Sequence, residues 1–274
     1  MSPELRATYR LQFHKGFTFA DAEALVPYLA ALGISHLYAS PITTAVPGST
    51  HGYDVADPTR INPELGGEAD FERLAARLAE RGMGVLLDIV PNHMAASSHN
   101  PFWLEMLERG PDCPAARLFD VFWEQGRLLL PVLGDPLQAT LEAGQLSLRA
   151  EESGRIVLAY ADHIFPLRLE SVSELRAAAG LGEAPAALDA EDRAKLAAAL
   201  AVADLPSLLD AQHWRLAWWR MAAHDLNYRR FFNITDLVGV RVEDPEVFEI
   251  VHRLPLDLVR RGLVHGLRID HIDG

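Results

Sequence analysis

The chain of 274 residues is long enough to bury a large core, and with 49% apolar residues it is expected to be globular. Its formal net charge of −13 argues against nucleic acid or an anionic membrane as a partner, because both repel an acidic surface. The single cysteine, Cys113, excludes an intramolecular disulfide and a cysteine-based zinc cluster. The sequence has no apolar run of membrane-spanning length and does not start like a signal peptide, so we expect a soluble, cytoplasmic protein.

The first ninety residues alternate segments with strand and helix patterns. Strands are predicted over 8–12 and 34–39, and the apolar run over 84–93 is typical of a strand buried on both faces of a parallel sheet. Helices are predicted over 18–33 and 68–81. The expected apolar side of the first comprises Ala24, Leu25, Tyr28, Leu29 and Leu32, and that of the second comprises Phe71, Leu74, Ala75 and Leu78. This alternation at short spacing predicts βα units.

The alternation is interrupted over residues 94–240, where the content is mixed. A hairpin is predicted over 146–160, an alanine-rich helix over 190–203 and a further helix over 207–226. The last of these would carry Trp214, Trp218 and Trp219. These tryptophans fit either core packing or a sugar-facing surface.

After the interruption, a helix beginning at Pro245 and an apolar strand ending near Asp270 resume the pattern. The chain therefore predicts an α/β fold that is the first half of a (β/α)₈ TIM barrel, strands 1–4, with a mixed α/β insertion after strand 3. We expect residues 1–93 and 241–274 in the barrel and residues 94–240 in an inserted subdomain, mainly helical with a β-hairpin. Half a barrel leaves open edges and an unfilled centre, so the C-terminal remainder of the same protein, or a second chain, should complete it.

The last predicted strand carries an unusual pair of charged residues. Arg268 and Asp270 occupy alternate positions, so both side chains point to one face. The guanidinium would hold the carboxylate ionised and oriented, as a carboxylate nucleophile requires. Alternatively, Asp270 caps a following helix and Arg268 makes an ordinary ion pair.

Polar residues also follow two other predicted strands. His51, Tyr53 and Asp54 lie in a turn-rich loop over 47–58 after the second strand, while Asp88, Asn92 and His93 lie on and after the third. Because active sites of such barrels sit at the carboxyl ends of the strands, these residues and Asp270 should border one cleft. Neighbouring strands lie about 4.8 Å apart, so His93 and Asp270 would flank one pocket.

Two of these segments resemble motifs of a known family. Residues 88–93 (Asp-Ile-Val-Pro-Asn-His) resemble the first shared motif of the α-amylase family of glycoside hydrolases and transglycosylases, and residues 266–270 (Gly-Leu-Arg-Ile-Asp) resemble its second. Within that family, the chain is most similar to members that convert the reducing-end α-1,4 bond of a maltooligosaccharide to an α,α-1,1 bond. That similarity is carried by residues 9–13, 49–54, 227–232 and 270–274.

The resemblance implies a retaining intramolecular transglycosylation on a maltooligosaccharide. Asp270 matches the nucleophile and Arg268 its positioning partner. His93 matches a residue that binds the sugar on the cleaved side, Tyr53 an aromatic platform beneath that sugar, and Asp88 a carboxylate that orders the strand end and the neighbouring arginine. Asp88 could instead be purely structural.

The resemblance also implies further substrate contacts and the absence of a metal. His51, His271 and Asp273 are candidates for substrate binding. Asn92 matches a calcium-binding position of many amylases, but the trehalose-forming members are not expected to depend on it, so no metal or other cofactor is expected. Common amylases carry a Lys-His pair where this chain has Asp273-Gly274, a departure that favours the trehalose-forming members.

A retaining enzyme of this type needs a second carboxylate, the general acid/base, about 5 Å from the nucleophile. In the family it is a Glu on the fifth barrel strand, beyond the end of this sequence, and we expect it from the part that completes the barrel. Two alternatives remain open: an amylase-like hydrolase in which water resolves the intermediate, and a non-catalytic carbohydrate-binding subunit. The latter would be expected to lack Asp270 or Arg268, which are both present.

Overall fold

The computed structural model describes residues 3–182 and 188–272. The chain divides into two compact units, one formed by residues 1–101 with 230–274 and the other by residues 102–229. The sequence predicts these boundaries between residues 93 and 94 and between residues 240 and 241. The segments next to these boundaries join the first unit because β6 (His93–Ala95) pairs with β13 (Ile234–Gly239), which in turn pairs with β12 (Arg230–Phe231).

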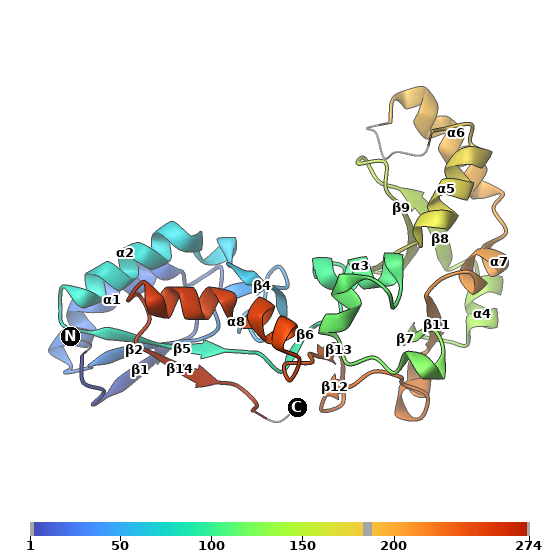
Figure 1. Cartoon of the computed structure of the whole chain (residues 1–274). Helices are drawn as coiled ribbons and strands as arrows, with labels where there is room; N and C mark the ends of the chain where they lie inside the picture. The colour runs from blue at the N-terminus through green and yellow to red at the C-terminus, as the bar shows by residue number, and fades with distance from the viewer. Residues whose placement is uncertain (1–2, 183–187, 273–274) are drawn as a thin grey trace. The chain divides into compact units, whose positions relative to one another are not determined.

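A parallel sheet forms the centre of the first unit (Figure 1). Its strands are β1 (Thr8–Leu11), β2 (His36–Ala39), β5 (Gly84–Ile89) and β14 (Gly266–Ile269), in that spatial order. These are the strands that the sequence predicts, but the second begins at His36 instead of residue 34, and the third ends at Ile89 instead of residue 93. Over the described residues the sheet does not close into a barrel.

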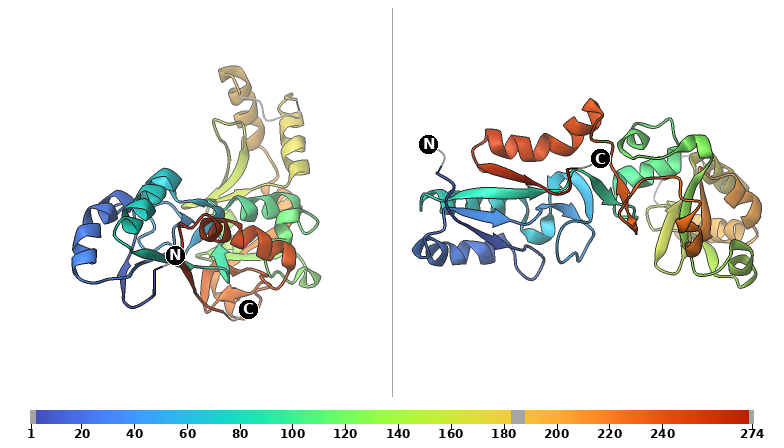
Figure 2. Two further views of the ribbon diagram at one scale, coloured as in Figure 1. Left: turned by 60° about the vertical axis from the view of Figure 1, so that its left-hand side comes forward. Right: turned by 90° about the horizontal axis from the view of Figure 1, so that it is seen from below.

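Helices cover one face of this sheet (Figures 1 and 2). They are α1 (Phe19–Ala31), α2 (Gly67–Ala79) and α8 (Pro245–Arg260). Because side chains of a strand alternate between faces, Leu37, Val85 and Leu87 join the core beneath the helices. The alternate positions, among them Tyr38 and Asp88, project from the opposite face.

The predicted apolar sides of the two N-terminal helices agree with the buried residues to different degrees. On α2 the predicted residues Phe71, Leu74, Ala75 and Leu78 are all buried. On α1 the prediction is confirmed for Leu29, which is buried, but it is wrong for Tyr28 and Leu32, which are 58% and 52% exposed. The buried residues of α1 are Phe19, Ala22, Val26 and Leu29. Phe19 decides this orientation, because its ring packs edge-on against both Phe13 and Phe71.

The turn-rich loop after the second strand is shorter than predicted. Strand β3 (Thr43–Ala45) pairs with β4 (Val55–Ile61), so the residues from Val55 onward are extended although Pro58 lies among them. A hydrogen bond from Ser49 Oγ to Asp54 Oδ1 and another from the amide of Gly52 to Ser49 Oγ order the loop between the two strands. This loop carries His51 and Tyr53.

The second unit is mixed α/β. Its helices are α3 (Pro101–Arg109, which begins at the boundary), α4 (Leu137–Glu142), α5 (Leu169–Ala178), α6 (Ala190–Ala201) and α7 (Leu205–Asp210). Its strands are β7 (Leu128–Leu133), β8 (Leu146–Ala150), β9 (Ile156–Tyr160), β10 (His163–Pro166) and β11 (Trp214–Trp218). The predicted hairpin is confirmed by the antiparallel pairing of β8 with β9, and the predicted alanine-rich helix is α6.

The predicted helix over 207–226 is wrong. α7 ends at Asp210, and the following segment is the strand β11, which runs parallel to β7. Trp214 and Leu216, two positions apart, are both buried, which is the spacing of a strand. The indole N–H of Trp214 donates to the carbonyl of Pro166, so this tryptophan belongs to the core.

Two histidines lie close together at the amino ends of β2 and β14: His36 is the first residue of β2, and His265 directly precedes β14. His36 is 4% exposed, and its ring centroid is 6.1 Å from that of His265, whose Nδ1 accepts a hydrogen bond from the amide of Val85. Gly84 makes this approach possible, since a Cβ there would lie 2.6 Å from the ring of His36. Burial and the neighbouring His265 lower the pKa of His36, and burial lowers the pKa of His265.

We therefore expect the free energy of unfolding to fall as the pH drops below about 6.5, the unperturbed histidine value. Below it the unfolded chain binds protons that the folded histidines do not, and this loss continues down to their lowered folded pKa. Denaturant unfolding at about pH 7.5 and about pH 5.5 would measure the effect, with His36→Gln as the comparison. A pH dependence identical in the variant would contradict this account.

Among the described residues, no helix combines the length and apolar character needed to cross a membrane.

Candidate active site

A buried carboxylate lies at the carboxyl end of β5. The side chain of Asp88 is fully shielded from solvent. Its Oδ2 accepts hydrogen bonds from the hydroxyls of Tyr38, at 3.0 Å, and Tyr53, at 2.7 Å, and its Oδ1 accepts one from Arg268 Nη1 at 3.0 Å. These donors satisfy an ionised group that would be costly to bury alone.

Arg268 joins this carboxylate to Asp270. Its Nη1 also donates to Asp270 Oδ1, at 2.5 Å, so the two side chains meet as their alternate positions in the sequence predict. The hydrogen bonds to Asp88 and Asp270 raise the pKa of Arg268, which keeps this bridging group cationic. The amide of Asp270 donates to the carbonyl of Ile89, which extends the pairing of β14 with β5 by one residue. The Asp270 side chain keeps 18% of its surface exposed, so it remains accessible.

Tyr53 comes from the loop between β3 and β4. Burial, and the hydrogen bond to Asp88, raise the pKa of Tyr53; burial, and the charge of Asp88, raise the pKa of Tyr38. Both hydroxyls therefore stay protonated and keep donating to the carboxylate. His51 is next to this contact: its Nδ1 accepts the amide N–H of Tyr53 and lies 3.7 Å from Asp54. With 48% of its side chain exposed, His51 is available to a ligand.

His93 and His271 are linked by an aromatic cluster. The ring of His93, at the start of β6, is buried and lies 4.0 Å from the ring of Phe231. Phe231 is in turn 4.7 Å from His271, the residue after Asp270. Phe232 also contacts His271 and is 70% exposed. The structure thus connects His93 to the segment that carries Asp270 through Phe231 and His271. Asp273, also predicted as a substrate contact, lies outside the described residues.

Asn92, the residue before β6, is buried, and its carbonyl accepts the amide N–H of Val240. This bond connects the segment after β5 to the end of β13. The structure accordingly gives the backbone of Asn92 a structural contact. The role of its side chain stays a prediction from the resemblance.

Two residues near Asp88 were missed as site residues in the sequence. Tyr38 donates directly to the buried carboxylate, and Arg10 Nη2 donates to the hydroxyl of Tyr53 at 3.1 Å. The sequence does contain a signal for them, because polar side chains in the middle of a strand need hydrogen-bond partners. In the register of β1 with β2, Arg10 lies opposite Tyr38. Finding them required knowing which neighbouring strand pairs with which.

Comparisons with known proteins show which proteins the chain resembles. The model of the α-amylase catalytic domain matches residues 23–127. A curated protein of Mycobacterium tuberculosis, whose name includes the words maltooligosyl trehalose synthase, is 41% identical over 278 residues, which covers 98% of this chain and 31% of that protein. The chain is therefore similar to the α-amylase family over residues 23–127. The resemblance inferred from the motifs is thereby confirmed for the family and for these relatives.

Solved structures give the same result for the fold. The maltooligosyltrehalose synthase from Arthrobacter ramosus is 39% identical, with a TM-score of 0.78 over 97% of this chain and 31% of that one. Another solved maltooligosyl trehalose synthase is 36% identical, with a TM-score of 0.80 over 98% of this chain and 32% of that one. The chain spans about a third of the length of the relatives it matches.

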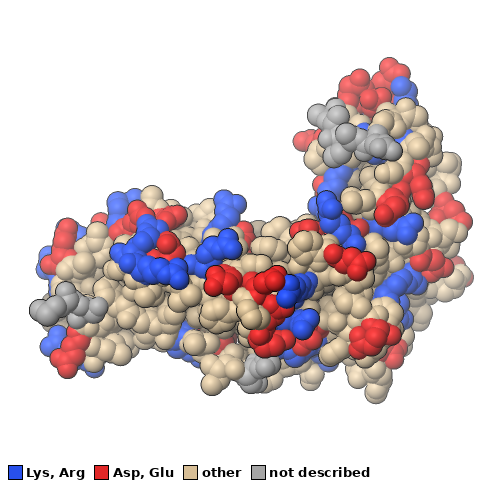
Figure 3. Space-filling model, viewed as in Figure 1, with Lys and Arg blue, Asp and Glu red and all other residues tan. Residues whose placement is uncertain are grey.

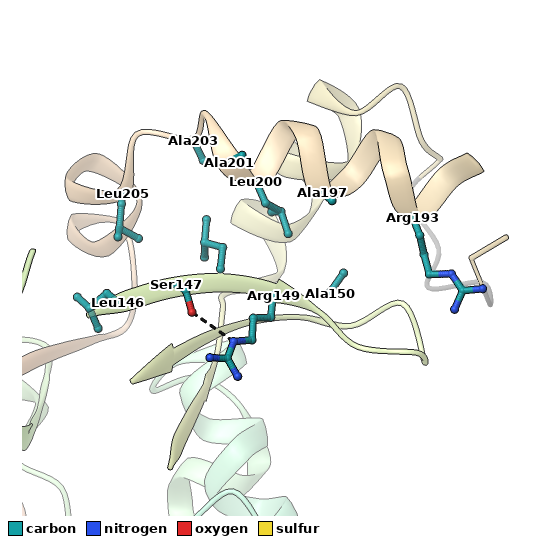
Figure 4. A pocket seen from close by; sticks show the side chains of 11 residues that line it. Leu146, Ser147, Arg149, Ala150, Arg193, Ala197, Leu200, Ala201, Ala203 and Leu205 are labelled. Atoms are coloured by element: carbon teal, nitrogen blue, oxygen red, sulfur yellow. Dashed lines mark hydrogen bonds between the residues drawn. The ribbon is translucent and has the colours of Figure 1, made fainter. Parts of the chain in front are cut away.

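The second unit contains a separate pocket of about 590 Å³ between β8 and α6 (Figure 4). Leu146, Leu148, Ala197 and Leu200 are among its lining residues. Ser147, Arg149 and Arg193 also line it, and Figure 4 shows the side chains of Ser147 and Arg149 on the side of β8 that faces away from α6. None of the predicted site residues lines it.

Acidic and basic side chains are interspersed over the face of the molecule seen in Figure 3. Arg261 of α8, for example, pairs with Glu68 and Glu72 of α2 and with Asp257 of its own helix. Such exposed pairs contribute little to stability, typically about 0–1 kcal/mol each.

Proposed function

We propose that this chain supplies the nucleophile side of an active site that converts the reducing-end α-1,4 bond of a maltooligosaccharide to an α,α-1,1 bond, giving a terminal trehalose unit. The observation that carries the proposal is the bridge from Asp88 through Arg268 to Asp270 at the carboxyl edge of the sheet. The names of the relatives at about 40% identity over nearly the whole chain support the same substrate class.

The proposed chemistry retains the configuration at the anomeric carbon through two displacements. The Asp270 carboxylate attacks that carbon and forms an ester, while the departing glucose takes the glycosidic oxygen and a proton from the general acid. The released glucose then turns so that its own anomeric hydroxyl attacks the anomeric carbon of the glycosyl ester. The general base takes the hydroxyl proton, a 1,1 bond forms and Asp270 is regenerated. No water is consumed.

In this proposal Arg268 orients the Asp270 carboxylate, while Asp88 fixes Arg268. The buried carboxylate with its tyrosine donors supports that role, because Arg268 Nη1 donates to Asp88 and to Asp270 and so ties the position of one carboxylate to that of the other. Tyr53 would lie beneath the sugar on the cleaved side, since its ring is on the same edge of the sheet as Asp88.

The remaining substrate contacts are proposed from the same resemblance. His93 would bind the sugar on the cleaved side, and His51, His271 and Asp273 would contact the substrate around it. The partial exposure of His51 and the position of His271 directly after Asp270 support this proposal.

We further propose that the parallel sheet is the first half of a (β/α)₈ barrel and that the complete protein, or a second chain, supplies the other half. The order β1-β2-β5-β14 and the helices on one face support this idea. The second carboxylate, about 5 Å from Asp270 in a retaining enzyme, would come from that part. The reaction as written needs no metal ion or other cofactor.

Incubation of the complete protein with maltopentaose tests the function. Reducing ends and the anomeric region of the proton NMR spectrum would be followed together. Loss of reducing ends with a new 1,1 linkage and no free glucose is the expected result. A rise in reducing ends would show a hydrolase instead, and sugar binding without any conversion would show a carbohydrate-binding subunit.

A further inference from the structure

Arg10 holds the group that donates to the buried carboxylate. Its Nη2 donates to the hydroxyl oxygen of Tyr53 at 3.1 Å, and the Tyr53 hydroxyl donates to Asp88 at 2.7 Å. A tyrosine hydroxyl has one hydrogen and rotates to suit its partners. With Arg10 occupying a lone pair of that oxygen, the single hydrogen is directed at Asp88.

The same guanidinium also reaches the second tyrosine. The Cζ atom of Arg10 lies 5.6 Å from the ring centroid of Tyr38, within the range of a cation–π contact. Tyr38 is the other hydroxyl donor to Asp88. Arg10 therefore contacts both tyrosines that satisfy Oδ2 of the carboxylate, although it does not touch Asp88 itself.

Gln12 fixes the loop on which Tyr53 lies. Arg10 Nη1 donates to Gln12 Oε1 at 3.1 Å, and Gln12 Nε2 donates to the carbonyl of Thr50 at 2.7 Å. A guanidinium is a rigid fork, so binding Gln12 with one nitrogen sets the direction in which the other nitrogen points. The end of β1 thus holds both the loop and the hydroxyl of Tyr53.

We propose that Arg10 is a positioning residue for the nucleophile Asp270, acting through the Tyr53 and Tyr38 hydroxyls on Asp88 and from there through Arg268. This inference rests on the proposed function of Asp270. It adds a contribution from β1, which is separated in the sheet from β14 by β2 and β5.

The test is a double-mutant cycle in the complete protein with Arg10→Ala, Tyr53→Phe and the double variant. Arg10→Ala should lower kcat by about 10- to 100-fold, because a small displacement of a reacting group costs this much. In the Tyr53→Phe background the same change should have a several-fold smaller effect, since the hydroxyl that it directs is already gone. Arg10→Lys should restore part of the activity, because one ammonium can bind Tyr53 but cannot also hold Gln12.

Arg77→Ala is the matched control, because Arg77 is an exposed arginine paired with Glu80 on α2. It should leave kcat unchanged. An unchanged kcat in Arg10→Ala, or an equal loss in both Tyr53 backgrounds, would overturn the inference. If the unaltered protein releases reducing ends instead of forming the 1,1 bond, the proposed function fails, and the same cycle measured on hydrolysis still decides the role of Arg10.

Discussion

The Asp270→Asn variant of the complete protein is expected to lose about 10⁴-fold or more of its kcat, the scale typical of removing a nucleophile. Asparagine has the same shape and its amide oxygen can still accept the hydrogen bond that Arg268 donates. An amide cannot form the glycosyl ester, so the loss comes from the chemical step and not from packing. The rate of 1,1-bond formation from maltopentaose, measured by proton NMR, gives the effect.

The matched control is Asp257→Asn on α8. Asp257 is also a carboxylate bound to an arginine, Arg261, but it is half-exposed on the helix. We expect this variant to keep its kcat and its melting temperature. An Asp270→Asn variant with kcat within about tenfold of the unaltered protein would rule out the nucleophile role, since that is far less than a nucleophile contributes.

The second large effect is expected from Arg268→Met, which should reduce both activity and stability. Methionine fills much of the same volume, but it leaves the fully buried Asp88 carboxylate without its only arginine donor among the described residues. An unsatisfied buried acceptor costs about 1–3 kcal/mol, and more when it is charged. Because Asp270 also loses its partner, kcat should fall by about 100-fold.

Arg261→Met is the control that separates the loss of the buried Asp88 contact from the loss of an arginine ion pair in general. Arg261 binds Glu68, Glu72 and Asp257, which are all at the surface, where solvent screens ion pairs, so its replacement should cost much less stability than that of Arg268. Denaturant unfolding of both variants measures the difference. Equal losses of stability in the two variants would contradict the idea that Arg268 contributes more to stability because its partner Asp88 is buried.

The sequence correctly predicted those helices and strands whose hydrophobic pattern fits only one kind of element. α2 has a single amphipathic face and acidic residues in its first turn, and its predicted core residues are buried. The strand β5 begins at a glycine and is apolar apart from Asp88, and it pairs on both sides in the sheet. In both cases the local preference and the tertiary packing agree.

In other segments the apolar residues fit two alternative arrangements equally well. In α1 two apolar stripes compete, and the contacts of Phe19 with Phe13 and Phe71 select the one that is buried. In the segment around Trp214 the apolar residues fit both a helix and a strand, and the pairing with β7 selects the strand. These contacts join residues far apart in the chain, so a local pattern does not contain them.

The candidate site was predictable in part for the same reason. The meeting of Arg268 with Asp270 follows from the alternation of one strand, and the position of Asp88 follows from the order of parallel strands. The roles of Tyr38 and Arg10 depend on the register of β1 with β2 and on the path of the loop that carries Tyr53. Register and loop path are set by tertiary contacts, which motif reading does not supply.

The most direct test of the proposed chemistry is to trap the covalent intermediate. The complete protein would be incubated with a fluorinated maltosyl fluoride, which forms the glycosyl ester quickly and loses it slowly, and digested for peptide mass spectrometry. The account predicts a maltosyl adduct on the peptide that contains Asp270, with fragment ions placing it on that carboxylate and none in Asp270→Asn. An adduct on another carboxylate, or full turnover without any adduct, would contradict it.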